Sequence, residues 1–429
     1  MSAELREEDE LVESEIFEKL SKTSRGTTEQ SITNAVVVLE NDSNFKNKIK
    51  LNSLSHNIEL IGDTAWNRNG CAWTESDSNN LNMYMEKYGI KNHKFIDNAL
   101  HIVANNHEYH PIREYLLNLQ WDGTERIAHA LHHFLGSAEN EITENSLKIF
   151  MLGALERIFH PGSKFEYMLC LIGGQGNGKS TFFRFLSIKD EWFTDDIRKL
   201  DDDKVFYKLS GHWIIEMPEM LATSNAKSIE ENKAFISRQF DTHRGVYEKY
   251  ATDIPRQCVY GGTSNRKRFL PFDRTGNRRF LPIETNEDET EIHILSDEKN
   301  SRQYMDQMWA EAMEIYKKGN YSLTLSKEME KKFAIHRLDF MAEDTLAGQV
   351  QAFLDNKTGR DANVTCSKEV YAAIHGPDHV PEKHETNEIC DVLNTSIVGW
   401  VQKGSHTFSN YGKQRCWIMQ ILLYAFVHL

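Results

Sequence analysis

The chain has 429 residues, of which 40% are hydrophobic and 27% are charged, and its formal net charge is −14. This length allows two or three domains with at least one sizeable core, and the composition is that of an ordinary globular protein. Six widely separated cysteines without a C-x-x-C pair indicate neither a zinc ribbon nor a disulfide framework, so we expect thiols in a reducing cytoplasm.

No apolar segment follows a basic one at the N-terminus, so we expect no signal peptide. The longest apolar stretch, residues 418–427, is about half the length of a membrane-spanning helix. A buried strand or helix, or a subunit contact, is the better interpretation. We therefore expect a cytoplasmic protein without a membrane partner.

The charge is distributed unevenly along the chain. Residues 1–18 contain eight acidic residues and one basic residue, which is typical of a solvated tail, and we expect residues 1–30 to be disordered. Residues 256–279 contain seven basic residues and one acidic residue. Because local charge density decides what a surface binds, nucleic acid stays open as a partner despite the negative total.

Helical patterns dominate the region before residue 140. Apolar residues recur at helical spacing over residues 80–89 and 113–118, and Pro111 suits the first turn of the second helix. Residues 33–40 are apolar and either helical or extended. Further helices are expected over 125–135 and 146–159. We assign residues 31–140 to a mainly helical collar or partner-binding domain.

The pattern changes at residue 167. Three short apolar runs, residues 167–172, 213–215 and 258–261, alternate with helical stretches over 180–186 and 227–240. Continuous apolar strands separated by helices are typical of a parallel sheet covered on both faces. The fold class predicted for residues 141–345 is therefore α/β with a parallel sheet, closed by a helix over 305–318.

A separate small domain is expected over residues 346–429. Two helices, over 368–374 and 386–394, precede a hairpin over 400–417 with Gly404 at its turn. Two helices followed by a hairpin indicate a winged-helix-like domain.

The segment from Gly173 to Ser180 fits the pattern G-x-x-x-x-G-K-[ST] between a buried strand and a helix. The glycines let backbone N–H groups point at a β-phosphate, and the helix N-terminus adds positive potential. Lys179 would reach the β- and γ-phosphates of ATP, and the Ser180 hydroxyl would coordinate Mg²⁺. The predicted nucleotide-binding residues are Gly173, Gly174, Gly176, Asn177, Gly178, Lys179, Ser180 and Thr181.

Hydrolysis needs further groups at the ends of neighbouring strands. The second apolar run ends in Glu216, with Glu219 three residues later. Glu216 would hold Mg²⁺ through its water shell, and Glu219 would orient or deprotonate the attacking water. Glu stands where many such sites have Asp, so the division of roles between the two acids stays open. Asn265, after the third strand, would bind the γ-phosphate or the water.

Arginines follow the third strand at Arg274, Arg278 and Arg279. An arginine supplied by a neighbouring subunit neutralises transition-state charge, and Arg278 and Arg279 are the leading candidates. Contact with a DNA backbone, or a salt bridge to the excess acid of the domain, is an equally good interpretation for each one.

In combination, these segments resemble the virulence-associated protein E family of phages, prophages and pathogenicity islands. The resemblance covers about residues 52–318 and includes residues 109–116 and 120–126 ahead of the phosphate loop. It implies a P-loop AAA+ core of the superfamily 3 helicase kind, assembled in a bacterial host as a hexameric ring with ATP between subunits. It further implies a helicase or replication-initiation ATPase of a mobile genetic element.

The resemblance also implies DNA binding. In superfamily 3 helicases a hairpin between the acidic strand and the sensor strand points into the ring channel, which here corresponds to residues 233–254. Arg244, Tyr247 and Lys249 are its expected contacts to single-stranded DNA, and packing into its own subunit is an equally good interpretation of Tyr247. Duplex DNA at an origin is a further candidate partner. Too few residues precede the core for a primase domain, so a primase on another chain is expected.

Two other functions are candidates for a chain with this loop. A P-loop small-molecule kinase would need a lid and a substrate pocket, and a non-motor regulator would use ATP only to control assembly or DNA binding. His129, His132 and His133 lie close together on a predicted helix, but a metal site would need another ligand. A solvated or packed helix face is the better interpretation of these histidines.

Overall fold

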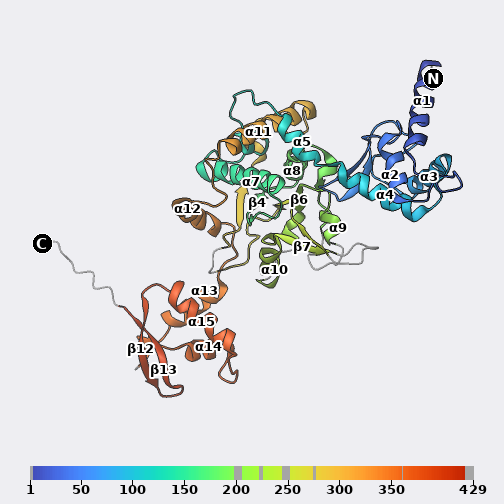
Figure 1. Ribbon diagram of the computed structural model, residues 1–429. Coiled ribbons are helices and arrows are strands. Elements are labelled where there is room, and N and C mark those ends of the chain that lie inside the picture. Colours follow the sequence, from blue (N-terminus) through green and yellow to red (C-terminus); the bar gives the residue numbers. More distant parts are fainter. Residues whose placement is uncertain are drawn as a thin grey trace. The chain divides into compact units, whose positions relative to one another are not determined.

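The structure is a computed structural model. It describes residues 3–197, 205–221, 226–243, 252–273, 277–359 and 361–420. The chain divides into two compact units (Figure 1). The first comprises Met1–Lys267 and Arg278–Arg337, and the second comprises Arg268–Asn277 and Leu338–Leu429. Within the described part of the chain, no helix is long and apolar enough to cross a membrane.

The N-terminal part of the first unit has a hydrophobic core of its own. Apolar faces of its helices meet around Val38, Leu100 and Val103, which are almost fully buried. A three-stranded sheet in the order β2-β1-β3 lies beside these helices. The elements are α1 (Ala3–Lys19), α2 (Ile32–Asn41), β1 (Ile49–Asn52), β2 (Asn57–Leu60), α3 (Glu75–Met85), η1 (Glu86–Tyr88), α4 (His93–Asn106) and β3 (Glu108–Tyr109).

The prediction of a disordered acidic tail over residues 1–30 is wrong for the second half of α1. Ile16 and Leu20, one helical turn apart, are buried in the N-terminal core, while Glu15 and Glu18 lie on the exposed side of the helix. Burial of an apolar stripe stabilises the helix, and the acidic residues stay in water. Charge density alone was therefore a poor guide to order in this segment.

A buried ion pair between Arg68 and Asp77 stabilises the N-terminus of α3. The Asp77 carboxylate accepts hydrogen bonds from Arg68 Nε at 2.7 Å and from the Trp66 indole at 2.7 Å. Asp77 also forms a capping box with Thr74. Burial by itself would raise the pKa of Asp77, but the hydrogen bonds from Arg68, Thr74 and Trp66 outweigh it and hold this pKa well below its usual range.

We expect Asp77→Asn to lower the free energy of unfolding by about 1.5–3 kcal/mol at pH 7, because the bond to a charged partner is weakened. A carboxylate with a depressed pKa stabilises the fold above its unfolded-state pKa of about 3.9, and this contribution is lost as the pH falls further. Denaturant unfolding of both proteins at pH 7 and pH 3 would measure it. An equal difference at the two pH values would contradict this assignment.

The central part of the first unit is built on a five-stranded parallel sheet, as the sequence predicted. Its strand order is β10-β4-β9-β6-β5. Every residue of β4, β6 and β9 is buried, since the sheet is covered on both faces. The strands are β4 (Met168–Ile172), β5 (Phe193–Thr194), β6 (Ile214–Met217), β9 (Val259–Ser264) and β10 (Phe280–Glu284).

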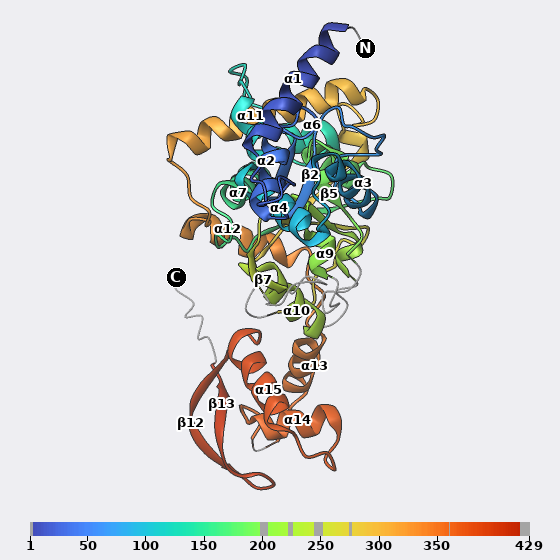
Figure 2. The ribbon, with the colours of Figure 1, turned by 45° about the vertical axis from the view of Figure 1, so that its right-hand side comes forward.

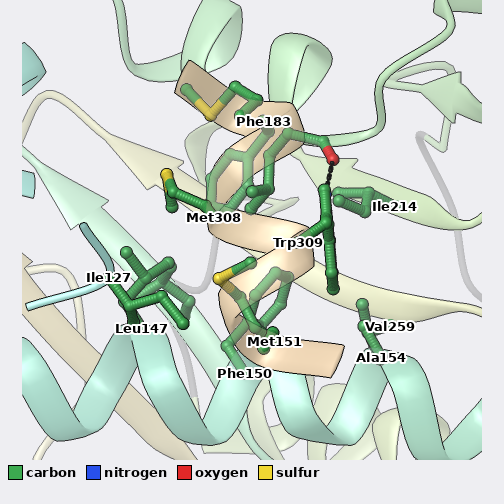
Figure 3. Close-up of a cluster of buried hydrophobic side chains, with 14 of the residues drawn as sticks. Ile127, Leu147, Phe150, Met151, Ala154, Phe183, Ile214, Val259, Met308 and Trp309 are labelled. Carbon is green, nitrogen blue, oxygen red and sulfur yellow. Dashed lines mark hydrogen bonds between the residues drawn. The ribbon is translucent and has the colours of Figure 1, made fainter. Parts of the chain in front are cut away.

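Several helices pack on one face of this sheet. Alternate residues of the strands point toward these helices and form the central core with them. Trp309 lies at the centre of this core, stacked on Trp213 with ring centroids 4.2 Å apart, and Figure 3 shows it between helix α7 and the sheet. Its indole N–H donates to the Leu186 carbonyl at 2.7 Å. The helices are α5 (Pro111–Asn118), α6 (Ala130–Leu135), α7 (Glu141–Phe159), α8 (Lys179–Leu186), α11 (Glu298–Lys318) and α12 (Lys327–Leu338).

The boundary predicted at residue 140 lies too late in the chain. Ile112 and Leu116 of α5, and Leu131 and Phe134 of α6, are buried in the central core together with α7 and the sheet. A boundary near residue 110 follows, because helical spacing predicts an apolar stripe but not the surface on which it packs.

The remaining elements of the first unit are short segments between the strands of the central sheet and after β10. Helix α9 (Val205–Leu209) precedes β6, and η2 (Asp190–Trp192) precedes β5. Helix α10 (Ala226–Ile236) leads into an antiparallel hairpin of β7 (Phe240–His243) and β8 (Thr252–Pro255). The short turns η3 (Pro218–Leu221) and η4 (Glu287–Glu289) follow β6 and β10.

The second unit contains three helices and a long hairpin, which Figure 2 shows with helices α13, α14 and α15. The sheet order is β11-β13-β12, and Trp400 and Trp417 join the helices in its core. The expected turn at Gly404 is wrong: Gly404 lies within β12 at a register shift, with φ +63°, and the hairpin turns after Phe408. The elements are α13 (Thr345–Asp355), β11 (Val364–Thr365), α14 (Ser367–His375), α15 (Lys383–Thr395), β12 (Trp400–Phe408) and β13 (Gly412–Met419).

Candidate functional site at the glycine-rich loop

The glycine-rich loop, residues 173–180, joins β4 to α8 at the carboxyl edge of the sheet. Gly176 and Gly178 have φ values of +95° and +74°, which favour glycine over other residues. At Gly173 a Cβ atom would lie 2.1 Å from Thr285 Oγ1, so no larger residue fits there. The loop therefore curls tightly onto the N-terminus of α8, the arrangement that exposes backbone N–H groups to an anion.

Lys179, the first residue of α8, turns its ammonium group back over the loop. It donates to the carbonyl oxygens of Gly173, at 2.8 Å, and Gly174, and lies 3.2 Å from Asn265 Oδ1. Burial lowers the pKa of Lys179, while the charges of Glu219 and Glu216 oppose that shift. A cation held in this way is available to an anionic ligand that enters the loop.

Glu216 lies at the end of β6 with only 1% of its surface exposed. Its Oε1 atom accepts hydrogen bonds from Ser180 Oγ and Thr263 Oγ1, each at 2.7 Å. Its Oε2 atom is buried without a hydrogen-bond partner. Burial raises the pKa of Glu216, against the effect of the bonds from Thr263 and Ser180. A buried carboxylate oxygen without a donor needs a cation or an ordered water, since leaving it alone is costly.

Glu219 lies in η3, just beyond β6, and its backbone has a φ of +47°. This left-handed conformation is costly for a residue with a side chain, and such strain is concentrated at functional sites. The Glu219 carboxylate accepts a hydrogen bond from Asn265 Nδ2 at 2.7 Å. Asn265 thus joins Glu219 to Lys179, and the two predicted acids occupy different positions around the loop.

These side chains line one depression of about 320 Å³ that is partly open to solvent. The volume lies within the range of small-ligand pockets. His293 and Leu295, from the segment after β10, also line it, and His293 Nε2 lies 3.4 Å from the Gly176 carbonyl oxygen. Sequence reasoning missed these two residues, because no motif marks the segment and only the fold brings it to the loop.

The donor set fits a magnesium–phosphate ligand. Mg²⁺ prefers hydroxyl, carboxylate and water oxygens, and Ser180 and Glu216 supply the first two within 2.7 Å of each other. The unpartnered Glu216 Oε2 atom is an acceptor for a metal-bound water. All the residues predicted around the phosphates and the metal are therefore neighbours in the structure.

Arg278 and Arg279 lie at the amino-terminal ends of the strands, whereas the glycine-rich loop lies at the carboxyl-terminal ends. Arg278 and Arg279 precede β10, whose first residue pairs with Met168 and whose last pairs with Ile172 at the loop. Five strand residues separate them from the loop by roughly 17 Å. Both guanidinium groups approach the Glu166 carboxylate, at 3.6 and 3.5 Å. Arg274 lies outside the described residues.

The predicted DNA-binding hairpin has its base in β7 and β8, between β6 and β9 in the chain. The strands are two short segments on either side of residues 244–251. Arg244, Tyr247 and Lys249 lie outside the described residues, so their predicted contacts stay predictions.

Two solved structures are similar to this chain. The NrS-1 C-terminal region, in an apo structure, is 13% identical, with a TM-score of 0.47, over 87% of this chain and 95% of that one. An A-form apo structure of the same region is 13% identical, with a TM-score of 0.47, over 86% and 96% of the two chains. No curated protein matched.

A family model of the virulence-associated protein E-like domain matches residues 116–342, which is more than half of the chain. The matched range begins in α5 and includes the whole five-stranded sheet and the residues around the glycine-rich loop. The resemblance inferred from the sequence is therefore confirmed, and the chain belongs to the virulence-associated protein E family.

Proposed function

We propose that this protein is an ATP-dependent DNA translocase, a helicase or replication-initiation ATPase of a mobile genetic element. The main observation in support of ATP hydrolysis is that one depression at the glycine-rich loop is lined by Lys179, Ser180, Glu216 and the hydrogen-bonded pair Asn265–Glu219. Family membership supports a role in the replication of a mobile element. The parallel sheet with its loop after β4 supports a P-loop core of the AAA+ class.

The residues divide the work of phosphoryl transfer to water among themselves. Backbone N–H groups of the loop and Lys179 bind the β- and γ-phosphates of ATP and orient the terminal phosphorus. Mg²⁺, when bound, neutralises the developing charge on the phosphate oxygens. Ser180 and Glu216 would hold that ion, with Glu216 Oε2 accepting from its water shell.

Glu219 is the better candidate to act on the attacking water. Glu216 is buried and already bonded to Ser180 and Thr263, whereas Glu219 is bonded to the amide of Asn265, which also approaches Lys179. A carboxylate bonded to a neutral amide is free to accept a proton from water. Asn265 would then couple the presence of the γ-phosphate to the position of the Glu219 carboxylate.

A ring accounts for the position of the arginines. Because Arg278 and Arg279 lie at the far edge of the sheet from the loop of their own subunit, they suit a site on a neighbouring subunit. We propose a homo-oligomer, with six subunits as in superfamily 3 helicases, that has ATP at each interface. The β7–β8 hairpin would carry the contacts to DNA in the channel, and a primase would come from another chain.

The second unit supports DNA binding as well. Its elements follow one another in the order of a winged helix: helix α13, strand β11, helices α14 and α15, and then the hairpin β12–β13. Lys403, Lys413 and Arg415 are exposed cations on the hairpin, suited to phosphate contacts. We propose that this unit binds duplex DNA.

Lys179→Ala tests the proposed site directly. We expect a fall in the rate of ATP hydrolysis of about a hundredfold to a thousandfold, since an electrostatic donor to the transition state is removed. Phosphate release with Mg²⁺ and single-stranded DNA would measure it. Lys317→Ala is the matched control, because Lys317 lies exposed at the end of α11.

Turnover by Lys179→Ala at the rate of the unaltered protein would disprove the site assignment. Phosphate transferred to an added small acceptor, with none released to water, would favour a kinase instead. Nucleotide binding without turnover, in the presence of DNA, would favour a regulator.

A further inference from the structure

Three histidines gather around one carboxylate next to the candidate nucleotide site. His133 Nδ1 lies 2.5 Å from Glu291 Oε2, and His129 Nε2 lies 3.1 Å from the same oxygen. His129 and His133 are one helical turn apart at the start of α6, whereas Glu291 comes from the segment after β10. The sequence showed the histidines without a further ligand, and the fold supplies it.

The hydrogen bonds of His129 leave one ring nitrogen facing Glu291. Its Nδ1 atom lies 2.6 Å from Glu139 Oε1, so this nitrogen carries a proton and donates to Glu139. In the neutral imidazole the Nε2 atom is then an acceptor, opposite another acceptor on Glu291. A proton on Nε2, or a metal ion between Nε2 and Glu291, satisfies both atoms. A histidine that donates its second nitrogen to a carboxylate is the usual arrangement of a metal ligand.

His132 adds a further donor to the same group. Its Nδ1 atom lies 3.0 Å from the Ser137 carbonyl oxygen, which fixes the proton on Nδ1. In the neutral imidazole the Nε2 atom then carries the lone pair, and it lies 4.0 Å from Glu291 Oε1. A small rotation of these partly exposed side chains would bring it into the group.

We propose that His129, His133 and Glu291 bind a divalent transition-metal ion, with His132 as the fourth ligand. Among the described residues, these three offer ligand atoms that all lie within 4.8 Å of one another. Imidazole nitrogens with one carboxylate suit Zn²⁺ best, at bond lengths of about 2.0–2.2 Å. The donor set differs from the hydroxyl and carboxylate oxygens at Ser180 and Glu216, which suit Mg²⁺.

The ion would fasten the segment after β10 to α6. The backbone already joins them, since Ile292 N–H donates to the His133 carbonyl at 3.1 Å and Asn286 N–H to the Leu135 carbonyl at 2.9 Å. Ile294, three residues beyond Glu291, is fully buried, and a Cβ on Gly178 would lie 3.0 Å from it. The bound metal thus stabilises one wall of the depression at the glycine-rich loop.

Metal titration of the untagged, EDTA-treated full chain tests the proposal. We expect Zn²⁺ to bind with one ion per chain by calorimetry, and Co²⁺ to give the visible absorption of a four-coordinate site. Glu291→Gln and His129→Ala should weaken Zn²⁺ binding about tenfold to a hundredfold. His101→Ala is the matched control, because His101 is exposed on α4, away from this group.

Thermal unfolding provides a second measurement. Without metal, Glu291→Gln should unfold close to the unaltered protein because Glu291 is partly exposed, and only the unaltered protein should gain stability with Zn²⁺. Lys179→Ala should bind Zn²⁺ normally, which separates this proposal from the nucleotide site. Absence of Zn²⁺ and Co²⁺ binding, or equal binding by Glu291→Gln, would overturn it.

Discussion

Replacement of Arg278 and Arg279 together by alanine is expected to lower ATP turnover by about three to five powers of ten, with little change in ATP affinity. The two guanidinium groups lie at the amino end of β10, whereas the loop lies at the carboxyl end of β4. An effect of this size on the rate would come from an arginine that enters the site of a neighbouring subunit. Steady-state phosphate release and nucleotide titration would separate turnover from binding.

Glu166→Gln is the matched control for the arginine variant. Both arginines approach Glu166, so a purely structural ion pair would lose as much from Glu166→Gln as from the loss of the arginines. A partly exposed ion pair is worth little, about 1 kcal/mol or less. If Glu166→Gln abolishes turnover to the same extent, the arginines serve the fold and not the reaction.

Mixed rings test whether the arginines act between subunits. Subunits with Lys179→Ala keep their arginines, and subunits with the arginine variant keep an intact loop. Some interfaces of a mixed ring then contain both functional halves, so mixing the two inactive proteins should restore part of the turnover. Turnover that stays at the level of the separate variants would contradict a shared site.

Trp309→Ala is expected to lower the free energy of unfolding by about 3–5 kcal/mol. The side chain is fully buried, stacks on Trp213, and donates to the Leu186 carbonyl at 2.7 Å. Its removal leaves a cavity between α7 and the sheet and an unpaired carbonyl. Domains of this kind are stable by about 5–15 kcal/mol, so denaturant unfolding would show a large shift.

Trp309→Phe separates the two contributions to this effect. Phenylalanine keeps the aromatic stack but loses the indole N–H, so we expect about 1–3 kcal/mol of destabilisation from the unpaired Leu186 carbonyl and the smaller ring. A cost of less than 1 kcal/mol for Trp309→Ala would show that the core at α11 is looser than its packing indicates.

Much of the candidate site was predictable because its chemistry is local in sequence. The loop from Gly173 to Ser180 needs glycines, a lysine and a hydroxyl at fixed spacing between a strand and a helix, and this pattern is readable without a structure. Glu216 and Asn265 were predictable for a related reason. Each follows an apolar run, and the carboxyl ends of parallel strands meet at one edge of the sheet.

Other features depend on contacts between distant segments, and single-sequence reasoning missed them. His293 and Leu295 join the depression, and Glu291 joins the histidines of α6, only because the chain after β10 folds back over the loop. The helix at the N-terminus was missed since its acidic composition concealed Ile16 and Leu20, which find a partner surface in the N-terminal core.

The family, the α/β class and the residues that line the depression at the glycine-rich loop were predictable from the sequence, since each depends on short-range spacing and hydrophobic pattern. The position of Arg278 and Arg279 at the amino end of β10, and the buried oxygen of Glu216 without a donor, became visible only in the folded chain. Strand order and burial come from packing between segments far apart in the chain, which short-range patterns do not encode. The same packing brought Glu291 to His129 and His133, which helical spacing had placed side by side without a ligand.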